Sequence, residues 1–287
     1  MQAGYRRRKG YIAEVPSAPS ITIVRCGGIA EHWRKVIERC EIGEAAGVQV
    51  LKAEGGNRVL ALPGEKGSAG LVVKRWELRT LGARVKSTLK RSRAWRHWKG
   101  ADRLTKAGVR TAACYAIARS TANDGTALEW LVMDRVPGKT LLRHMAEGDL
   151  TVRQEHGLAR AAGALVRSLS SKGYHNRDGK PSNLIVSWPA ADQPTITVID
   201  CVAIRQQSSF GGEHLRALAN LYIEPLGCKC APRRTLIARA LRAFGEPTSQ
   251  LVGRGGTWPA VRRELWSGIS GVIKAHGDPV PKVDPLS

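Results

Sequence analysis

The sequence feature that most restricts the fold is a polar loop placed directly before a short apolar hairpin. Residues 176–183 read NRDGKPSN, and the apolar segments LIVSW (184–188) and TITVID (195–200) follow, joined by the turn PAADQP. Two apolar segments joined by turn residues predict a β-hairpin. The loop in front of it is either an ordinary polar turn or a site that holds a charged substrate and a metal.

The elements around this hairpin divide the chain into a β-rich front half and a helix-rich back half. Strands are expected at 21–26, 48–53, 57–62, 70–76, 113–118 and 127–136, and helices at 30–40, 83–106, 212–222, 233–244 and 258–275. A capping box of Thr151 and Gln154 begins another helix. We therefore expect an α+β chain with a basic tail at 1–20, a small β-rich lobe at 21–136 and a larger, mainly helical lobe at 137–287.

The net charge restricts the partners of the chain. The sequence has 46 Lys and Arg against 24 Asp and Glu, a formal charge of +22 at pH 7. A protein this basic is expected to meet polyanions, which include nucleic acid, anionic membrane surfaces and phosphorylated substrates. No apolar run is long enough to span a membrane, and the cysteines suit a reduced cytosol, so we expect a cytoplasmic protein. Cys228 and Cys230 have no second ligand pair at metal-binding spacing.

Four residues occur in the chain order that a phosphoryl-transfer site requires. Such a site needs a strand Lys for the ATP phosphates, an Asp for the acceptor hydroxyl, and an Asn and a second Asp that hold Mg²⁺. Lys74 ends the apolar strand GLVVK, and Asp200 ends TITVID. Asp178 lies five residues before Asn183, which is the spacing of the kinase catalytic loop. This order predicts a protein-kinase-like fold with ATP and Mg²⁺ as cofactors.

The chain resembles the protein-kinase-like superfamily and, within it, the bacterial lipopolysaccharide kinase family, which includes Kdo and heptose kinases. The narrower resemblance rests on VVKRW, SRAWRHWKGADRLTKAGVRTAACYAIA, LVMDRVPGKTL, HNRDGKPSNLIVSW and TVIDCVAIR. It covers about residues 48–222, and 48–136 is the best-matched part of the front lobe. The resemblance implies transfer of the γ-phosphate of ATP to a sugar hydroxyl of the lipopolysaccharide core or a related glycolipid.

The same resemblance implies a role for each matching residue. Asp178 is expected to be the catalytic base, and Lys180 a catalytic residue that neutralises the transferring phosphate. Lys74 is expected to anchor ATP. Asn183 and Asp200 are expected to be the metal ligands.

Several positions depart from the kinase pattern. Asn176 replaces the His of H-R-D, Cys201-Val202 replace Phe-Gly after Asp200, and Gly55-Gly56 is the nearest candidate for a Gly-rich loop. No Glu lies between residues 83 and 107 to pair with Lys74. Asp102 is the only acid in that interval, and Glu77 follows the lysine too closely.

Other functions stay open. The acceptor could be a protein Ser or Thr, or a small molecule such as an aminoglycoside. The chain could instead be a non-catalytic pseudokinase that binds membrane or nucleic acid, which the missing Glu favours. We expect an anionic glycolipid or phosphorylated sugar as substrate, and nucleic acid is not expected as a partner. The basic residues at 84–99 are either a solvated face or a contact with the inner face of the inner membrane.

Overall fold

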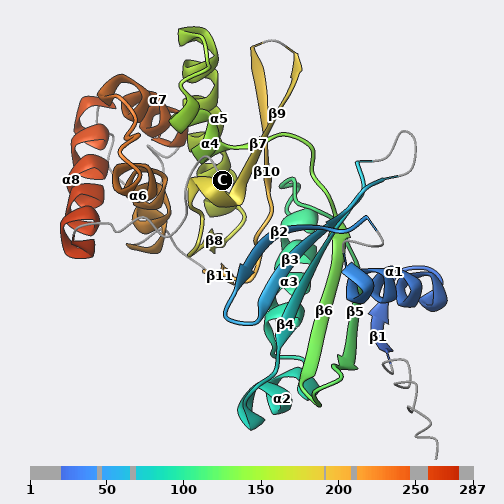
Figure 1. The fold of residues 1–287 in the computed structure, drawn as a ribbon. Helices are drawn as coiled ribbons and strands as arrows, with labels where there is room; N and C mark the ends of the chain where they lie inside the picture. Colours follow the sequence, from blue (N-terminus) through green and yellow to red (C-terminus); the bar gives the residue numbers. More distant parts are fainter. Residues whose placement is uncertain are drawn as a thin grey trace, which may run out of the picture.

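The computed structural model describes residues 21–43, 47–64, 69–190, 192–207, 212–245 and 258–277, and the expected tail at 1–20 lies outside them. Within these residues the chain forms a front lobe built on one large sheet and a back lobe that is mainly helical (Figure 1). No helix in the described ranges has both the length and the apolar character needed to cross a bilayer.

The front lobe is an antiparallel sheet with the strand order β1-β5-β6-β4-β3-β2. Its strands are β1 (Thr22–Cys26), β2 (Gln49–Glu54), β3 (Asn57–Leu62), β4 (Leu71–Glu77), β5 (Cys114–Thr121) and β6 (Ala127–Asp134). All six strands expected in this half are present. Strand β6 is buried along most of its length. Helices cover both of its faces, which explains its nearly continuous apolar sequence.

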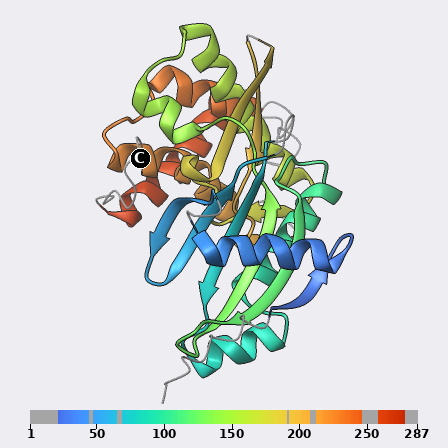
Figure 2. The ribbon, with the colours of Figure 1, turned by 45° about the vertical axis from the view of Figure 1, so that its right-hand side comes forward.

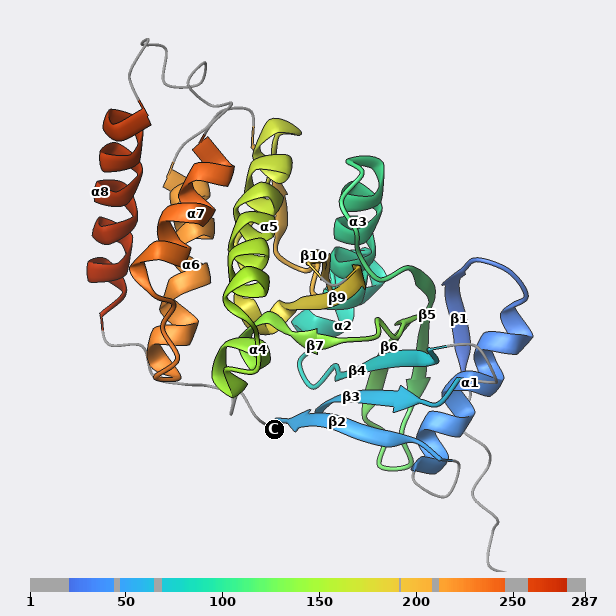
Figure 3. The ribbon, with the colours of Figure 1, turned by 90° about the horizontal axis from the view of Figure 1, so that it is seen from above.

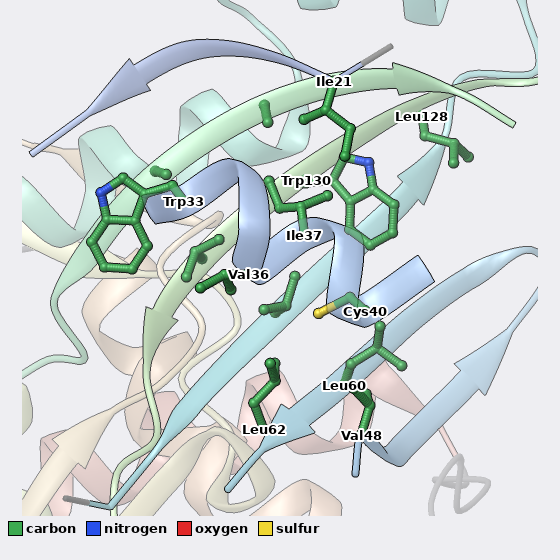
Figure 4. Packing of buried hydrophobic residues seen from close by; sticks show 14 residues of the cluster. Ile21, Trp33, Val36, Ile37, Cys40, Val48, Leu60, Leu62, Leu128 and Trp130 are labelled. Atoms are coloured by element: carbon green, nitrogen blue, oxygen red, sulfur yellow. The ribbon is translucent and has the colours of Figure 1, made fainter. Parts of the chain in front are cut away.

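Helix α1 (Ala30–Ile42) packs across one face of the sheet (Figure 2). Its buried residues recur at helical spacing, as an amphipathic helix requires, and they are Trp33, Val36, Ile37 and Cys40. Figure 4 shows these side chains beside Trp130 of β6 and Leu60 and Leu62 of β3. Residues before the kinase-like part of the sequence thus complete the front lobe with an edge strand and a covering helix.

The basic segment expected as one helix at 83–106 instead forms two helices, α2 (Leu81–Thr88) and α3 (Arg93–Lys106). Between them Lys90 adopts a left-handed backbone with a φ of 56°. Ser92 then begins α3, because its side chain accepts a hydrogen bond from the Trp95 backbone N–H. A serine cap satisfies an amide that no earlier helical carbonyl can reach, so this position begins a new helix.

Helix α3 covers the face of the sheet opposite α1 (Figure 2). Its Ala94 and Trp95 pack with Leu131 and Met133 of β6, whereas Trp130 and Val132 of the same strand face α1. Successive strand residues point to opposite faces of a sheet, so β6 contributes to both cores. This packing brings α3 alongside the hairpin of the back lobe (Figure 3).

The connection between the lobes runs from β6 into β7 (Lys139–Thr140) and α4 (Leu141–Glu147), a helix that the sequence did not predict. Gly138 has a φ of 125°, and a Cβ there would overlap the Val186 carbonyl oxygen. Strand β7 pairs with β9, so the connection lies directly against the predicted hairpin. Only glycine allows so close an approach in this backbone conformation.

The back lobe contains the hairpin, β9 (Leu184–Ala190) and β10 (Gln193–Val198), and the short pair β8 (Tyr174–Asn176) and β11 (Ile204–Gln206). Its helices are α5 (Val152–Ser171), α6 (Gly212–Gly227), α7 (Arg234–Gly245) and α8 (Trp258–His276). The hairpin and all of these helices were predicted. The capping box of Thr151 and Gln154 is also confirmed, because both of its reciprocal hydrogen bonds are present.

Candidate active site

The loop at 176–183 is shaped by its own amide side chains. Asn176 is buried, and its Oδ1 accepts a hydrogen bond from the Asp178 backbone N–H at 3.0 Å. Asn183 Nδ2 donates to the Asp178 carbonyl oxygen at 2.9 Å and to Asp178 Oδ2 at 3.1 Å. Asn176 therefore forms the turn, in the manner of an Asx turn, and the Asp178 carboxylate is fixed by Asn183.

Glu224 on α6 fixes the second half of the loop. Its two carboxylate oxygens accept hydrogen bonds from the Ser182 backbone N–H at 2.8 Å and from Ser182 Oγ at 2.7 Å. Lys180 Nζ lies 3.7 Å from Glu224 Oε1. Lys180 is thus held in the loop by an acid that lies about forty residues later in the chain.

Lys74 of β4 reaches from the front lobe to the residues that follow β10. Its Nζ donates a hydrogen bond to the Ile199 carbonyl oxygen at 3.2 Å and lies 3.7 Å from Asp200 Oδ2. The Ile199 backbone N–H in turn donates to the Asn183 carbonyl oxygen at 3.0 Å. Ile199 therefore links the loop at 176–183 to the lysine, and the structure brings Lys74, Asn183 and Asp200 to one place.

The two aspartates of this site have different electrostatic environments. Burial is the main cause that raises the pKa of Asp178; Lys180 opposes it, and the nearby Asp200 carboxylate adds to it. Burial also acts to raise the pKa of Asp200, but the charge of Lys74 outweighs it, so that this pKa lies below the usual range. Environments that push two carboxyl pKa values apart are typical of sites where the two groups have different tasks. Asp178 is the more basic of the two.

His97 on α3 belongs to this site, and the sequence did not point to it. Its side chain is fully buried, and its Nδ1 lies 3.6 Å from Asp200 Oδ1. Burial, followed by the charge of Lys74, lowers the pKa of His97 to about 3. The sequence pattern that could have pointed to His97 is its helical spacing from apolar residues. Ala94, His97, Ala101 and Leu104 share the buried face of the helix.

Neither acid near Lys74 in the sequence pairs with it. Glu77 lies within 3.4 Å of Arg75 and 2.7 Å of Arg79, and Asp102 lies 2.8 Å from Lys106. The partner of Lys74 is Asp200 instead.

The turn at Gly55-Gly56 occupies the place expected for a Gly-rich loop, between β2 and β3. Arg75 Nη2 donates to the Gly56 carbonyl oxygen at 3.3 Å, and Gly56 has a φ of 83°. The pKa of Glu54 beside this turn is lowered mainly by Lys52, with smaller contributions from Arg93 and Lys180. Arg75 of β4 thus ties this turn to the sheet.

Arg177 of the loop at 176–183 has a structural role. The Arg177 carbonyl oxygen accepts a hydrogen bond from Asn220 Nδ2 at 3.1 Å, and Arg177 Nε lies 3.9 Å from Glu213 Oε2, so this arginine stabilises the loop. None of the six cysteines, all of which lie within the described residues, forms a disulfide. An apolar cavity of about 170 Å³ between the helices of the back lobe, lined by Leu158, Leu218 and Leu241 among others, does not include the loop or Asp200.

A β-rich lobe with a strand lysine, a connection into a helical lobe, and a catalytic-type loop before a hairpin together define a protein-kinase-like fold. A solved structure described as "WaaP in complex with acyl carrier protein" matches 88% of this chain and 98% of its own chain, with a TM-score of 0.55 and 18% sequence identity. The predicted kinase-like α+β fold is thereby confirmed. The resemblance to lipopolysaccharide kinases is supported at the level of the fold.

The other comparisons limit what this match means. No protein-family model and no curated protein matches the sequence. Among solved structures 1710 chains match, so the fold is shared by many proteins and does not define the substrate by itself.

Proposed function

We propose that this chain is a kinase that uses ATP and Mg²⁺ to phosphorylate a sugar hydroxyl of the lipopolysaccharide core or of a related glycolipid. The observation that carries the proposal is the convergence of Lys74, from the front lobe, with Asp178, Asn183 and Asp200, from the back lobe. The fold match supports the reaction class. The sequence resemblance, together with the match to WaaP, supports the substrate class.

The roles follow from the position and charge of each side chain. Asp178 accepts the proton of the acceptor hydroxyl while the hydroxyl oxygen attacks the γ-phosphorus and ADP leaves with the bridging oxygen. Its raised pKa suits a group that must take up a proton. Lys74 binds the ATP phosphates from the front lobe, and Lys180, held by Glu224, balances charge on the transferring phosphoryl group.

The residues present fit a magnesium site. The Asp200 carboxylate and the Asn183 amide oxygen are hard donors, and Asn183 Nδ2 is already used by Asp178, which leaves Oδ1 for a cation. No group of three or more His, Cys, Asp or Glu side chains in the described part of the chain could hold a metal alone. Mg²⁺ commonly takes its remaining ligands from water and substrate phosphates, and it would supply charge neutralisation there.

The surface of α2 and α3 supports an anionic glycolipid acceptor at a membrane. Seven basic residues between positions 84 and 99 are exposed, namely Arg84, Lys86, Lys90, Arg91, Arg93, Arg96 and Lys99. On α2, Leu81, Val85 and Leu89 share one face at four-residue spacing and are 78%, 47% and 58% exposed. An exposed apolar stripe beside basic side chains is the pattern of a helix that lies in the interface of an anionic membrane.

The pseudokinase alternative would be favoured by a lysine without a partner. Lys74 contacts both Ile199 and Asp200, and the other residues that phosphoryl transfer requires are present. These contacts support an enzyme.

An acceptor panel tests the proposed function. The protein would be incubated with ATP, Mg²⁺ and three acceptors together. These acceptors are a soluble aminoglycoside, a Ser/Thr-rich protein, and vesicles that carry a lipopolysaccharide precursor. Mass spectrometry identifies the phosphorylated products. We expect one added phosphate on the glycolipid and none on the other acceptors. Phosphate on the protein or aminoglycoside alone would support those alternatives instead, and no transfer at all would support a pseudokinase.

A further inference from the structure

His97 has the features of a side chain that acts on Asp200. It is fully buried, and neither of its ring nitrogens has a hydrogen-bond partner within the described residues. A buried polar atom without a partner is costly, so its presence calls for an explanation. The Nδ1 of His97 faces the Asp200 carboxylate, whose Oδ1 lies 3.6 Å away.

Helix α3 is packed tightly against the backbone that follows Asp200. Gly100, one turn after His97, has no side chain, and a Cβ there would overlap the Cys201 carbonyl oxygen. One turn further on, Arg103 Nη1 donates to the Ile204 carbonyl oxygen at 3.5 Å. Residues three apart lie on one face of a helix, so a single face of α3 contacts Asp200, Cys201 and Ile204.

In protein kinases the corresponding helix provides a Glu that pairs with the strand lysine. Here α3 has no Glu, and Lys74 pairs with Asp200 directly. The two oxygens of Asp200 thus face different neighbours. Oδ2 faces Lys74, and Oδ1 faces both His97 and the Val202 backbone N–H, which donates at 3.1 Å.

We propose that His97 is a positioning residue that replaces the missing helix Glu by orienting the Asp200 carboxylate for the metal. This inference rests on the proposed function. The distance of 3.6 Å is too long for a hydrogen bond, but such contacts often tighten when the substrate complex forms. Carboxylates that bind metals are usually held by a further hydrogen bond. A neutral imidazole can donate this bond without adding a second negative charge beside Asp200.

The test uses two substitutions of His97 in the full chain. His97→Leu removes the hydrogen-bond donor and fills the same space with an apolar side chain. His97→Asn places an amide nitrogen near the position of Nδ1. The readout is the Mg²⁺ concentration needed for half of the ATP-induced thermal shift. Loss of a residue that orients a metal ligand typically weakens metal affinity by about 10- to 100-fold, so we expect this increase for Leu and partial recovery for Asn. ATP binding without metal should change little.

A second pair of variants separates positioning from general destabilisation. Gly100→Ala would push α3 away from Cys201, and Gly163→Ala would push α5 away from α7, because a Cβ at Gly163 would overlap the Ala240 carbonyl oxygen. Both substitutions should lower the melting temperature. Only Gly100→Ala should raise the Mg²⁺ requirement.

The outcomes are distinct. A normal Mg²⁺ requirement in both His97→Leu and Gly100→Ala, with a clear ATP response in the wild type, would overturn the role of His97 and leave the proposed function intact. An equal rise in Gly100→Ala and Gly163→Ala would also overturn it. A wild type without any Mg²⁺-dependent ATP response would overturn the proposed function itself.

Discussion

Lys74 Nζ and Asp200 Oδ2 lie 3.7 Å apart and come from opposite lobes. Each of these charges neutralises the other. Binding of ATP together with Mg²⁺ would replace this contact, because the ATP phosphates bind Lys74 while Mg²⁺ binds Asp200. Nucleotide and metal should therefore bind together rather than independently.

Lys74→Ala should weaken ATP binding in the presence of Mg²⁺ by about 10- to 100-fold, because a hydrogen bond to a charged group contributes roughly 1.5–3 kcal/mol. Isothermal calorimetry with a non-hydrolysable ATP analogue measures this affinity. Lys106→Ala is the matched control, since Lys106 forms an exposed pair with Asp102 and should have no effect. Equal affinities for both variants would contradict the role of Lys74.

Asp200→Ala and Asn183→Ala should each weaken the Mg²⁺-dependent part of ATP binding. Asp200→Ala should have the larger effect, because it removes a full negative charge as well as an oxygen donor. Titration of Mg²⁺ at fixed ATP gives the comparison, with Asp102→Ala as a control outside the site. An unchanged Mg²⁺ dependence in both variants would show that these residues do not hold the metal.

Glu224→Gln should lower turnover more than ATP affinity. The substitution removes the negative charge beside Lys180 and one acceptor of the Ser182 hydrogen bonds, which loosens the loop that holds Asp178. Loss of a charge-assisted hydrogen bond of this kind costs roughly 1–3 kcal/mol, and we expect a decrease of about 10-fold in kcat. Glu155→Gln on α5, whose partner is Arg233, is the control. A decrease in ATP affinity with kcat unchanged would contradict this role of Glu224.

Neutralising Arg91, Arg93 and Arg96 together should weaken binding to anionic vesicles and leave ATP affinity nearly unchanged. Each basic residue near such a surface contributes about 1 kcal/mol, and the contribution falls as salt screens it. Replacing Leu81, Val85 and Leu89 with Ser should weaken the same binding with little salt dependence, because their contribution is apolar.

Competition identifies the partner of this surface. Vesicles carrying a lipopolysaccharide precursor would compete with duplex DNA at equal phosphate concentration, since both interactions weaken as salt rises. Clear preference for DNA would contradict the lipid interpretation of α2 and α3.

Local sequence patterns were sufficient for most of the fold. The hairpin of β9 and β10 was predicted from its two apolar runs, and α5 from its cap and spacing. The break between α2 and α3 was missed because a run of basic residues hides the capping role of Ser92. Helix α4 was missed because it is short and follows the connection between the lobes.

The convergence of side chains in the candidate site was predictable only where these residues belong to a motif. Lys74, Asp178, Asn183 and Asp200 stand at motif positions, and the structure brings them together. Glu224 and His97 do not belong to a motif, because their contacts arise from the packing of distant helices on the loop and on Asp200. Such contacts depend on tertiary structure that spacing along the chain does not encode.

The most direct test of the central claim is phosphate transfer by the wild type and by Asp178→Asn. With ATP, Mg²⁺ and a lipopolysaccharide precursor, the account predicts that the wild type adds phosphate to the glycolipid. The variant should retain ATP affinity and lose about 10²- to 10⁴-fold in rate, as general-base removal does. Near-normal turnover by purified, folded Asp178→Asn would contradict the account.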